Sequence, residues 1–124
     1  MKKYFIIVFI FILNSFANAQ EFKKVYFAGG CFWCMEESFD QVNGVVSTIS
    51  GYSGGHLKNP TYQDVIYKDT GHVEAIEITY NPKIVSFNEL LDIYWKNIDP
   101  FDSAGQFCDK GKSYRSVIFF QTQP

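Results

Sequence analysis

The residues best suited to chemistry are three cysteines, and the first of them, Cys31, stands at a position that favours reactivity. The apolar run 24–28 is typical of a buried strand, and Gly29 and Gly30 then allow a tight turn. Apolar residues recur at helical spacing over 32–42. Cys31 therefore lies where a strand ends and a helix begins, and the free N–H groups and dipole of a helix N-terminus favour a thiolate. We predict that Cys31 is a nucleophile.

The spacing Cys31-x-x-Cys34 leaves several kinds of site open. It suits a thioredoxin-like redox pair, although the prolines of the chain are poorly placed for the proline loop of that fold. It also allows a zinc site completed by His72 and Cys108, although the ligand spacings are irregular. A c-type haem site requires histidine directly after Cys34, where Met35 stands instead.

A second group suited to chemistry is Glu74, near the start of an alternating segment over 72–80. Glu74 shares one face of this predicted strand with Ile76, Ile78 and Tyr80. If a helix covers that face, the carboxyl has little contact with water and its pKa rises. The alternative is that Glu74 is exposed at the end of the strand.

The elements that must position these groups alternate along the chain. The sequence predicts strands at 24–28, 45–51, 72–80 and 114–120, helices at 31–42 and from Ser86 to Asp99-Pro100, a short helical piece at 61–66, and an irregular stretch at 101–113. Ser86 and Glu89 form a capping box for the second helix. Five residues give this helix an apolar face that we assign to the core: Phe87, Leu90, Leu91, Tyr94 and Trp95.

This order predicts an α+β fold, a two-layer sandwich with a ferredoxin-like β-α-β-β-α-β core. Helices on one face of the sheet would bring the turn at Cys31 close to the start of the strand that carries Glu74. We expect a single domain over 23–124. Its formal net charge of −2 before any processing gives no indication of a nucleic-acid partner.

The first residues resemble a targeting segment. Met1-Lys2-Lys3, an apolar run and Ala17-Asn18-Ala19 together predict a signal peptide over 1–19, cleaved after Ala19. The apolar run is too short to span a bilayer, so no membrane span is expected after cleavage. We expect export to the periplasm or the exterior.

Several motifs, taken together and in order, resemble one family. They are Gly30-Cys31-Phe32-Trp33 followed by Glu37, Gly51-Tyr52-Ser53-Gly54-Gly55, Asn59-Pro60-Thr61-Tyr62, Gly71-His72-Val73-Glu74-Ala75 and Tyr114-Arg115-Ser116. This set resembles the A-type peptide methionine sulfoxide reductases, whose ferredoxin-like core agrees with the predicted element order. Relative to that family the chain is truncated at its C-terminus, and Ile98 stands where many relatives carry histidine.

The resemblance implies a reaction and a set of catalytic groups. Cys31 corresponds to the nucleophile that attacks the sulfoxide sulfur, and Glu74 to the acid that protonates or hydrogen-bonds the oxygen. Tyr62 and Tyr114 would add hydroxyl donors to that oxygen. Asp109 would assist through a hydrogen bond or a bound water. General acid catalysis suits this reaction because the sulfoxide oxygen is a poor leaving group.

The resemblance also implies a binding surface and a recycling step. Phe32 and Trp33 correspond to an aromatic wall for the S-methyl group of methionine sulfoxide, in oxidised proteins or free. Reaction leaves Cys31 as a sulfenic acid, which a second thiol resolves as a disulfide. We favour Cys108 over Cys34 because a loop holds a thiol more freely than a helix. A thioredoxin-like protein or dithiothreitol would then supply electrons, and no bound cofactor or metal is expected.

Overall fold

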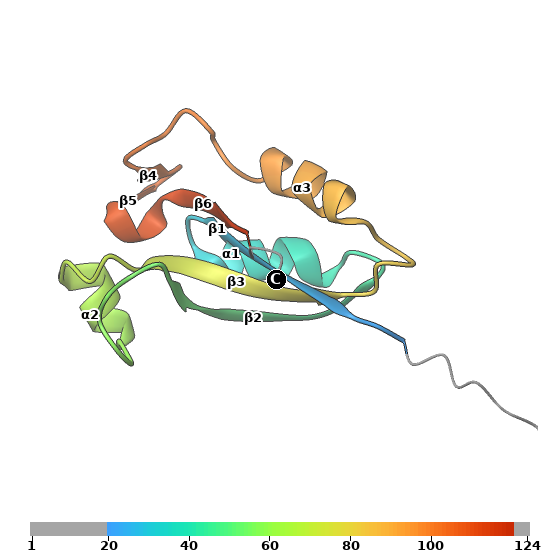
Figure 1. Ribbon diagram of the computed structural model, residues 1–124. Helices are drawn as coiled ribbons and strands as arrows, with labels where there is room; N and C mark the ends of the chain where they lie inside the picture. Colours follow the sequence, from blue (N-terminus) through green and yellow to red (C-terminus); the bar gives the residue numbers. More distant parts are fainter. Residues whose placement is uncertain (1–19, 121–124) are drawn as a thin grey trace, which may run out of the picture.

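The computed structural model of the protein describes residues 20–120 (Figure 1). The elements are β1 (Lys23–Gly29), α1 (Phe32–Asp40), β2 (Val45–Ser53), α2 (Tyr62–Tyr67), β3 (Val73–Tyr80), α3 (Phe87–Lys96), β4 (Gly105–Gln106), β5 (Asp109–Lys110), the 3₁₀ helix η1 (Lys112–Tyr114) and β6 (Ser116–Phe119). The predicted signal peptide lies outside the described residues. Within 20–120, no helix has the length and apolar character that a bilayer span requires.

Four strands form one antiparallel sheet in the order β2-β3-β1-β6. Counting only these strands, the order is that of a split βαβ, ferredoxin-like sheet. β4 and β5 pair separately as a small hairpin. The predicted α+β sandwich is confirmed, and β3, which carries Glu74, lies inside the sheet between β2 and β1.

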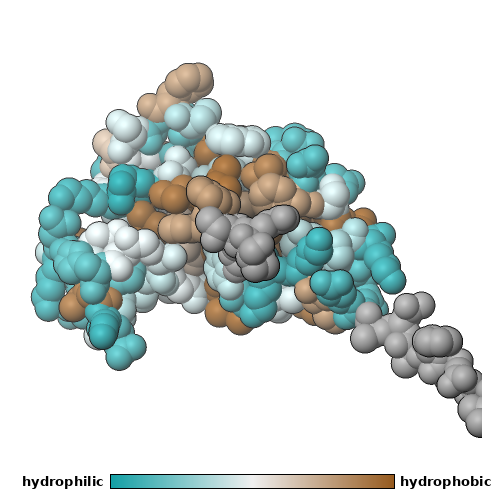
Figure 2. All heavy atoms as spheres, viewed as in Figure 1, coloured by the Kyte–Doolittle hydropathy of each residue, from teal (hydrophilic) through white to brown (hydrophobic). Residues whose placement is uncertain are grey.

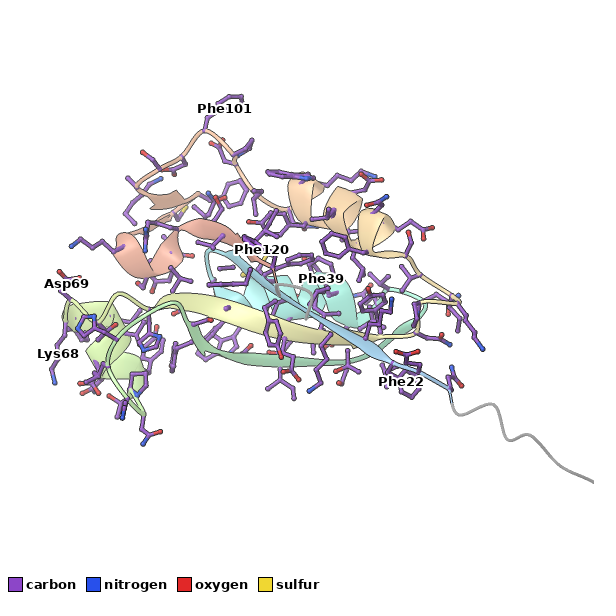
Figure 3. All side chains as sticks on the ribbon, in the orientation of Figure 1. Phe22, Phe39, Lys68, Asp69, Phe101 and Phe120 are labelled. Atoms are coloured by element: carbon purple, nitrogen blue, oxygen red, sulfur yellow. The ribbon has the colours of Figure 1, made fainter. Side chains whose placement is uncertain are left out.

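The main core lies between this sheet and the helices α1 and α3. Phe39 of α1 and Leu90 of α3 are fully buried beside Phe27 and Ile78 of the sheet. Figure 3 shows Phe101 projecting from the molecule, and Phe22 and Phe120 are also exposed, whereas Phe39 is fully buried. The viewed face in Figure 2 has apolar atoms gathered over its middle and polar atoms over α2.

Both capping boxes stabilise helix starts by local bonds. Ser86 accepts a hydrogen bond from the Glu89 N–H, and the Glu89 carboxylate accepts one from the Ser86 N–H, as predicted. The same reciprocal pair joins Thr61 and Asp64 at the start of α2. These bonds fix the first residue of each helix.

The predicted apolar face of α3 is too wide. Leu90 and Tyr94 are buried and Leu91 is half-buried, but Phe87 and Trp95 are 38% and 50% exposed. The i, i+3, i+4, i+7 pattern covers a broader arc than the helix presents to the sheet, so its two flanking residues lie at the rim.

Tyr94 fixes α3 to the end of β1. Its hydroxyl donates to the Ala28 carbonyl at 2.8 Å, and burial raises the pKa of Tyr94 to about 12. The hydroxyl therefore keeps its proton and this bond over the ordinary pH range. Ala28 comes three residues before Cys31, so the bond ties the helix close to the predicted nucleophile.

The stretch 101–113 is more ordered than predicted, because it contains β4, β5 and most of η1. Two-residue strands are too short to show alternation in a sequence. Gly105 allows the close approach of the hairpin strands, since a Cβ there would collide with the Asp109 carbonyl oxygen. The predicted strand 114–120 accordingly begins later, at Ser116. This hairpin positions Asp109.

Candidate active site

Cys31 is the residue that precedes the first turn of α1, at the junction predicted from the sequence. Its backbone is not helical, with φ −58° and ψ 116°, and its side chain is half-buried. Gly30, at φ +88°, makes the turn possible. A Cβ at Gly30 would lie 2.7 Å from the Gln106 Cβ, so the β4–β5 hairpin packs directly against this turn.

Glu74 is 1% exposed, so the first of the two alternatives for this residue is correct. Its Oε2 accepts a hydrogen bond from the Phe32 N–H at 3.0 Å, which places the carboxyl at the first residue of α1. Its Oε1 has no hydrogen-bond partner among the described residues. Burial raises the pKa of Glu74, and the negative charge of Asp109 raises it further, against the opposing effect of the Phe32 bond. The site therefore favours the protonated acid.

Four aromatic rings form a wall beside this carboxyl, which we call the aromatic wall: Phe32, Trp33, Tyr52 and Tyr62. Phe32 is buried and lies 5.6 Å from Trp33 and 5.7 Å from Tyr52, between ring centroids. Trp33 and Tyr62 are nearly parallel, at 9° and 6.5 Å, and both are partly exposed. The wall is apolar and open to solvent on one side.

Tyr52 is a site residue that the sequence analysis missed. It lies directly opposite Glu74 in the β2–β3 ladder. Burial and the Glu74 charge both raise the pKa of Tyr52. The predicted strand ended at Gly51, two residues before the observed end of β2 at Ser53, and left Tyr52 in a loop. Extending the strand alternation by one position would have placed it across from Glu74.

Tyr114, at the end of η1, joins the site from the C-terminal part of the chain. Burial and a hydrogen bond with the Tyr62 hydroxyl raise the pKa of Tyr114, with smaller contributions from Glu74 and Asp109. Tyr114 therefore keeps its proton and can donate a hydrogen bond. The structure thus gathers Tyr62, Tyr114, Asp109 and Glu74 around the first turn of α1.

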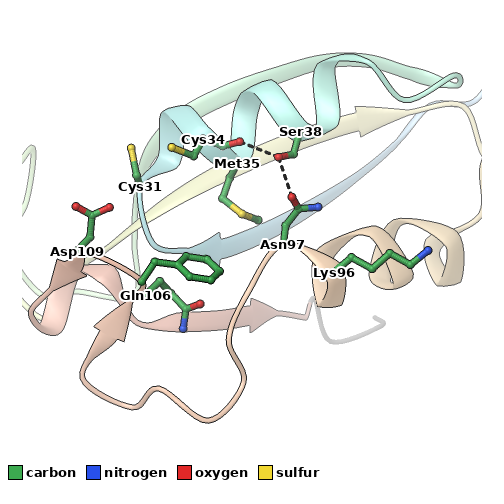
Figure 4. Close-up of a pocket in the computed structure, with 10 residues that line it drawn as sticks. Cys31, Cys34, Met35, Ser38, Lys96, Asn97, Gln106 and Asp109 are labelled. Carbon is green, nitrogen blue, oxygen red and sulfur yellow. Dashed lines mark hydrogen bonds between the residues drawn. The ribbon is translucent and has the colours of Figure 1, made fainter.

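A pocket of about 260 Å³ opens on the other side of the nucleophile (Figure 4). Its lining, which defines the cysteine pocket, consists of Gly29, Cys31, Cys34, Met35, Ser38, Lys96, Asn97, Gln106, Phe107 and Asp109. The Ser38 hydroxyl lies 2.9 Å from the Cys34 carbonyl oxygen and 3.1 Å from the Asn97 Oδ1, and so links α1 to the end of α3.

Cys34, not Cys108, lies beside Cys31. Figure 4 shows the Cys34 sulfur directed toward Cys31, and a hydrogen bond between the two thiols is the largest cause of the raised pKa of Cys34. Cys34 and Cys108 are both exposed, but Cys34 lines the cysteine pocket and Cys108 does not. We expected Cys108 to be close because its neighbour Asp109 is. Cys108 lies in the turn between β4 and β5, whereas Asp109 begins β5 and lines the pocket, so adjacency in sequence does not bring Cys108 into it.

The zinc and thioredoxin-like alternatives find no support in the described residues. Over 20–120, no cluster of three His, Cys, Asp or Glu side chains is arranged to hold a metal ion. The His72 ring is instead engaged by the Gly55 N–H and the Leu57 carbonyl. A thioredoxin-like fold includes parallel strands, whereas every pair in this sheet is antiparallel.

Comparison with known proteins identifies the family to which this chain belongs. The sequence pattern of the family described as "Peptide methionine sulfoxide reductase" matches residues 23–124. The chain is 50% identical over 101 residues to the peptide methionine sulfoxide reductase MsrA of Streptococcus agalactiae, and 49% identical over 104 residues to that of Listeria innocua. These matches cover 82% and 84% of this chain but 60% and 59% of the relatives, so the chain spans about 60% of their length.

Solved structures show the same likeness. Methionine sulfoxide reductase A of Corynebacterium diphtheriae superposes with a TM-score of 0.79 at 35% identity, over 84% of this chain and 49% of that one. Reduced Mxr1 from Saccharomyces cerevisiae gives a TM-score of 0.75 at 33% identity, over 81% of this chain and 60% of that one. The family pattern, the sequence identities and the fold agree, and this chain belongs to the A-type peptide methionine sulfoxide reductases.

Proposed function

We propose that this chain reduces the S epimer of methionine sulfoxide to methionine, in oxidised proteins or as the free amino acid, at the expense of thiols. The observation that carries the proposal is the state of Glu74. This carboxyl is buried, which raises its pKa, and it has one oxygen fixed by the Phe32 N–H and the other without a partner among the described residues. It lies at the turn that carries Cys31.

The proposed chemical step transfers oxygen from the substrate sulfur to the Cys31 sulfur. The thiolate attacks the sulfoxide sulfur while Glu74 gives a proton to the sulfoxide oxygen. This forms a bond between the two sulfurs and leaves a hydroxyl on the substrate sulfur. The hydroxyl then passes to the Cys31 sulfur as the bond between the two sulfurs breaks, so the substrate leaves as a thioether and Cys31 is left as a sulfenic acid. Protonation by a positioned acid contributes typically about 10²–10⁴-fold to such a step. Tyr62 and Tyr114 stabilise the developing charge on oxygen by hydrogen bonds.

The aromatic wall is the proposed binding surface for the S-methyl group. Phe32 and Trp33 supply apolar surface adjacent to the acid, as the family resemblance implies, and Tyr52 extends that surface. A methyl group on this wall leaves the sulfoxide oxygen to be received by Glu74. The wall thereby orients the sulfur toward Cys31.

We propose Cys34 as the thiol that resolves the sulfenic acid, in place of Cys108. Its sulfur is directed toward Cys31 in the same pocket, so attack on the sulfenic sulfur forms a disulfide and releases water. A dithiol such as a thioredoxin-like protein or dithiothreitol restores both thiols by exchange. The cysteine pocket gives that reductant access to Cys34.

We further propose that residues 23–124 act as one catalytic domain after removal of a signal peptide over 1–19, and that the protein is exported to the periplasm or beyond. The short basic start, the apolar run and the small-x-small site before Gln20 support the export proposal. The continuous family match over 23–124 supports the single domain.

The decisive experiment measures reduction of the separate S and R epimers of N-acetyl-methionine sulfoxide with dithiothreitol. We expect turnover of the S epimer only, and loss of turnover in Cys31→Ser. An inactive parent protein would contradict the proposal and indicate an inert member of the fold.

A second candidate activity, exchange with protein disulfides, is favoured by the adjacency of the Cys31 and Cys34 thiols. The same proteins are therefore assayed on a disulfide substrate. Turnover of disulfides without turnover of sulfoxide would establish this second activity in place of the first.

A further inference from the structure

The imidazole of His72 joins two segments that carry proposed catalytic groups, although the chemistry above gives it no part. His72 comes immediately before β3, two residues before Glu74. Its ring contacts the loop 54–60, which leads through Thr61 into α2 and Tyr62. The residue therefore stands between the acid and one of the hydroxyl donors.

Both ring nitrogens of His72 are hydrogen-bonded to the backbone of that loop. The Gly55 N–H donates to Nδ1 at 3.2 Å, and Nε2 lies 2.8 Å from the Leu57 carbonyl oxygen. A backbone N–H can only donate and a carbonyl can only accept, so Nδ1 carries the lone pair and Nε2 carries the hydrogen. The ring is thus held as the neutral Nε2–H tautomer by two bonds of opposite polarity.

The ring also packs against the loop without a gap. A Cβ at Gly55 would collide with Cγ and Cδ2 of His72, so only glycine permits this approach. Thr70, which is 3% exposed, ties the same two segments: its hydroxyl accepts the His72 N–H at 3.2 Å and its carbonyl accepts the His56 N–H at 2.9 Å. The loop is therefore fixed to the start of β3 from two sides.

The position of Tyr62 depends on this loop. Tyr62 is the first residue of α2, and its ring lies 6.5 Å from the Trp33 ring, nearly parallel to it, and 6.4 Å from the Phe32 ring. We propose that His72 is a positioning residue, which clamps the loop 54–60 to the start of β3 and so sets where Tyr62 lies relative to Glu74. The kinetic part of this inference rests on the proposed reductase function.

The kinetic test compares His72→Leu with His72→Gln. The leucine side chain makes neither bond, and we expect kcat/KM for the sulfoxide to fall about 10- to 100-fold, mainly through kcat, because small displacements of catalytic groups have effects of that size. Glutamine presents an acceptor and a donor on one carbon, as the imidazole does, and should keep kcat/KM within about threefold of the parent.

His56→Leu is the matched control. It changes the other histidine of the chain, in the same loop, whose ring makes no hydrogen bond to any described residue. We expect it to remain within about twofold of the parent, since substitutions away from such contacts have small effects. An equal loss in His56→Leu and His72→Leu would overturn the assignment.

A second test needs no turnover. Nitrogen-15 NMR of the parent protein should show the His72 ring as the Nε2–H tautomer. In a Trp95→Phe background, where Trp33 is the remaining tryptophan, His72→Leu should change the Trp33 emission because Tyr62 moves relative to it. His72→Gln should leave that emission unchanged.

A third measurement shows whether the effect is confined to the loop. In a Cys34→Ser, Cys108→Ser background, Cys31 is the remaining thiol. Its alkylation rate should be the same with and without His72→Leu, because the clamp acts on Tyr62 and not on the thiol. A changed rate would overturn the assignment, since the substitution would then disturb the turn before α1 as well.

The outcomes separate the two proposals. If the protein reduces no sulfoxide, the reductase proposal fails. The tautomer of His72 and the Trp33 emission still show whether His72 holds the loop 54–60 in place. An Nδ1–H tautomer overturns the clamp, even where His72→Leu does not fold. A His72→Leu protein with parental Trp33 emission and parental kcat/KM would also overturn the proposal that His72 positions the loop.

Discussion

The two oxygens of the Glu74 carboxyl have different surroundings, and this asymmetry decides where a proton resides. Oε2 accepts the Phe32 N–H and cannot share that direction with a hydrogen of its own. Oε1 has no partner among the described residues. The proton of the neutral acid is therefore best placed on Oε1, where it is available to a substrate oxygen.

Glu74→Gln should separate acid catalysis from the structural bond. The amide oxygen can still accept the Phe32 N–H, but the amide is not an acid. We expect kcat/KM for the S epimer to fall about 10²-fold or more, with KM changed much less. Steady-state kinetics checks this. A fall of less than about threefold would contradict the role of the carboxyl as the proton donor.

The raised pKa of Glu74 also predicts how stability depends on pH. The folded protein holds this proton more tightly than the unfolded chain, so the stabilisation is complete below the ordinary value of 4.5 and is lost as pH rises through the higher folded-state pKa. Urea unfolding at several pH values should show the parent losing stability relative to Glu74→Gln over that range. Parallel curves for the two proteins would contradict the pKa shift.

The two candidate resolving thiols differ in a way that mass spectrometry can read. After one equivalent of sulfoxide, the parent should contain one disulfide and release one methionine. Cys108→Ser should do the same, because the Cys108 thiol is exposed and lies outside the cysteine pocket. Cys34→Ser should accumulate the sulfenic acid, trapped by dimedone. A disulfide in Cys34→Ser would restore Cys108 as the resolving thiol.

At the scale of elements, the β4–β5 hairpin depends on one buried amide. Gln106 is 1% exposed, and its side chain bonds to both backbone groups of Asp99: the Asp99 N–H donates at 2.6 Å and the Asp99 carbonyl accepts at 2.8 Å. Its Cβ packs on Gly30. One side chain thus connects the end of α3, the hairpin that carries Asp109 and the turn before Cys31.

Gln106→Leu should therefore destabilise the protein by about 1–3 kcal/mol, because both Asp99 groups lose their partner. It should also lower kcat/KM through displacement of the hairpin. Gln63→Leu, at an exposed glutamine on α2, is the control and should have little effect. Urea denaturation measures the first effect. Equal stability of the two leucine variants would show that the hairpin is held by other contacts.

Local signals predicted most elements, whereas very short elements and long-range contacts escaped prediction. The capping box at Ser86 and the strand that carries Glu74 are read from a few adjacent residues, and both are present in the structure, although burial alternates only in the second half of that strand. The β4–β5 pairing depends on a close approach at Gly105 that no periodicity reveals. Cys108 was misplaced for a related reason: nearness in sequence does not determine which way a side chain points.

For the molecule as a whole, the ferredoxin-like topology joins distant parts of the chain at one end of the sheet. Cys31, Glu74 and Tyr114 come from three separate segments and meet there because β1 pairs with both β3 and β6. Glu74 extends from a strand that has a neighbour on each side, so the course of that strand is set by two ladders. From the sequence alone, the proximity of these three residues can be inferred only from the order of the helices and strands.

The export proposal also belongs to this scale. Expressed in a bacterium with its full sequence, the protein should be recovered outside the cytoplasm with Gln20 as its first residue. The intact mass of the fractionated protein checks this. Replacing apolar residues of the run Tyr4–Leu13 by charged ones should retain it in the cytoplasm with its N-terminus intact. Recovery of the unchanged sequence in the cytoplasm would contradict the proposal.

The fixed place of Glu74 on an inner strand has a consequence for handedness. A sulfoxide sulfur is a stereocentre. Under the proposed function its oxygen would meet Glu74, its methyl group would meet the aromatic wall, and the sulfur itself would meet Cys31. In the mirror-image epimer, two of these three contacts can be made at once, but the third substrate group is then directed away from its partner. Under the proposed function, discrimination between epimers would follow from the arrangement of these three partners, without a further group dedicated to rejecting the wrong epimer.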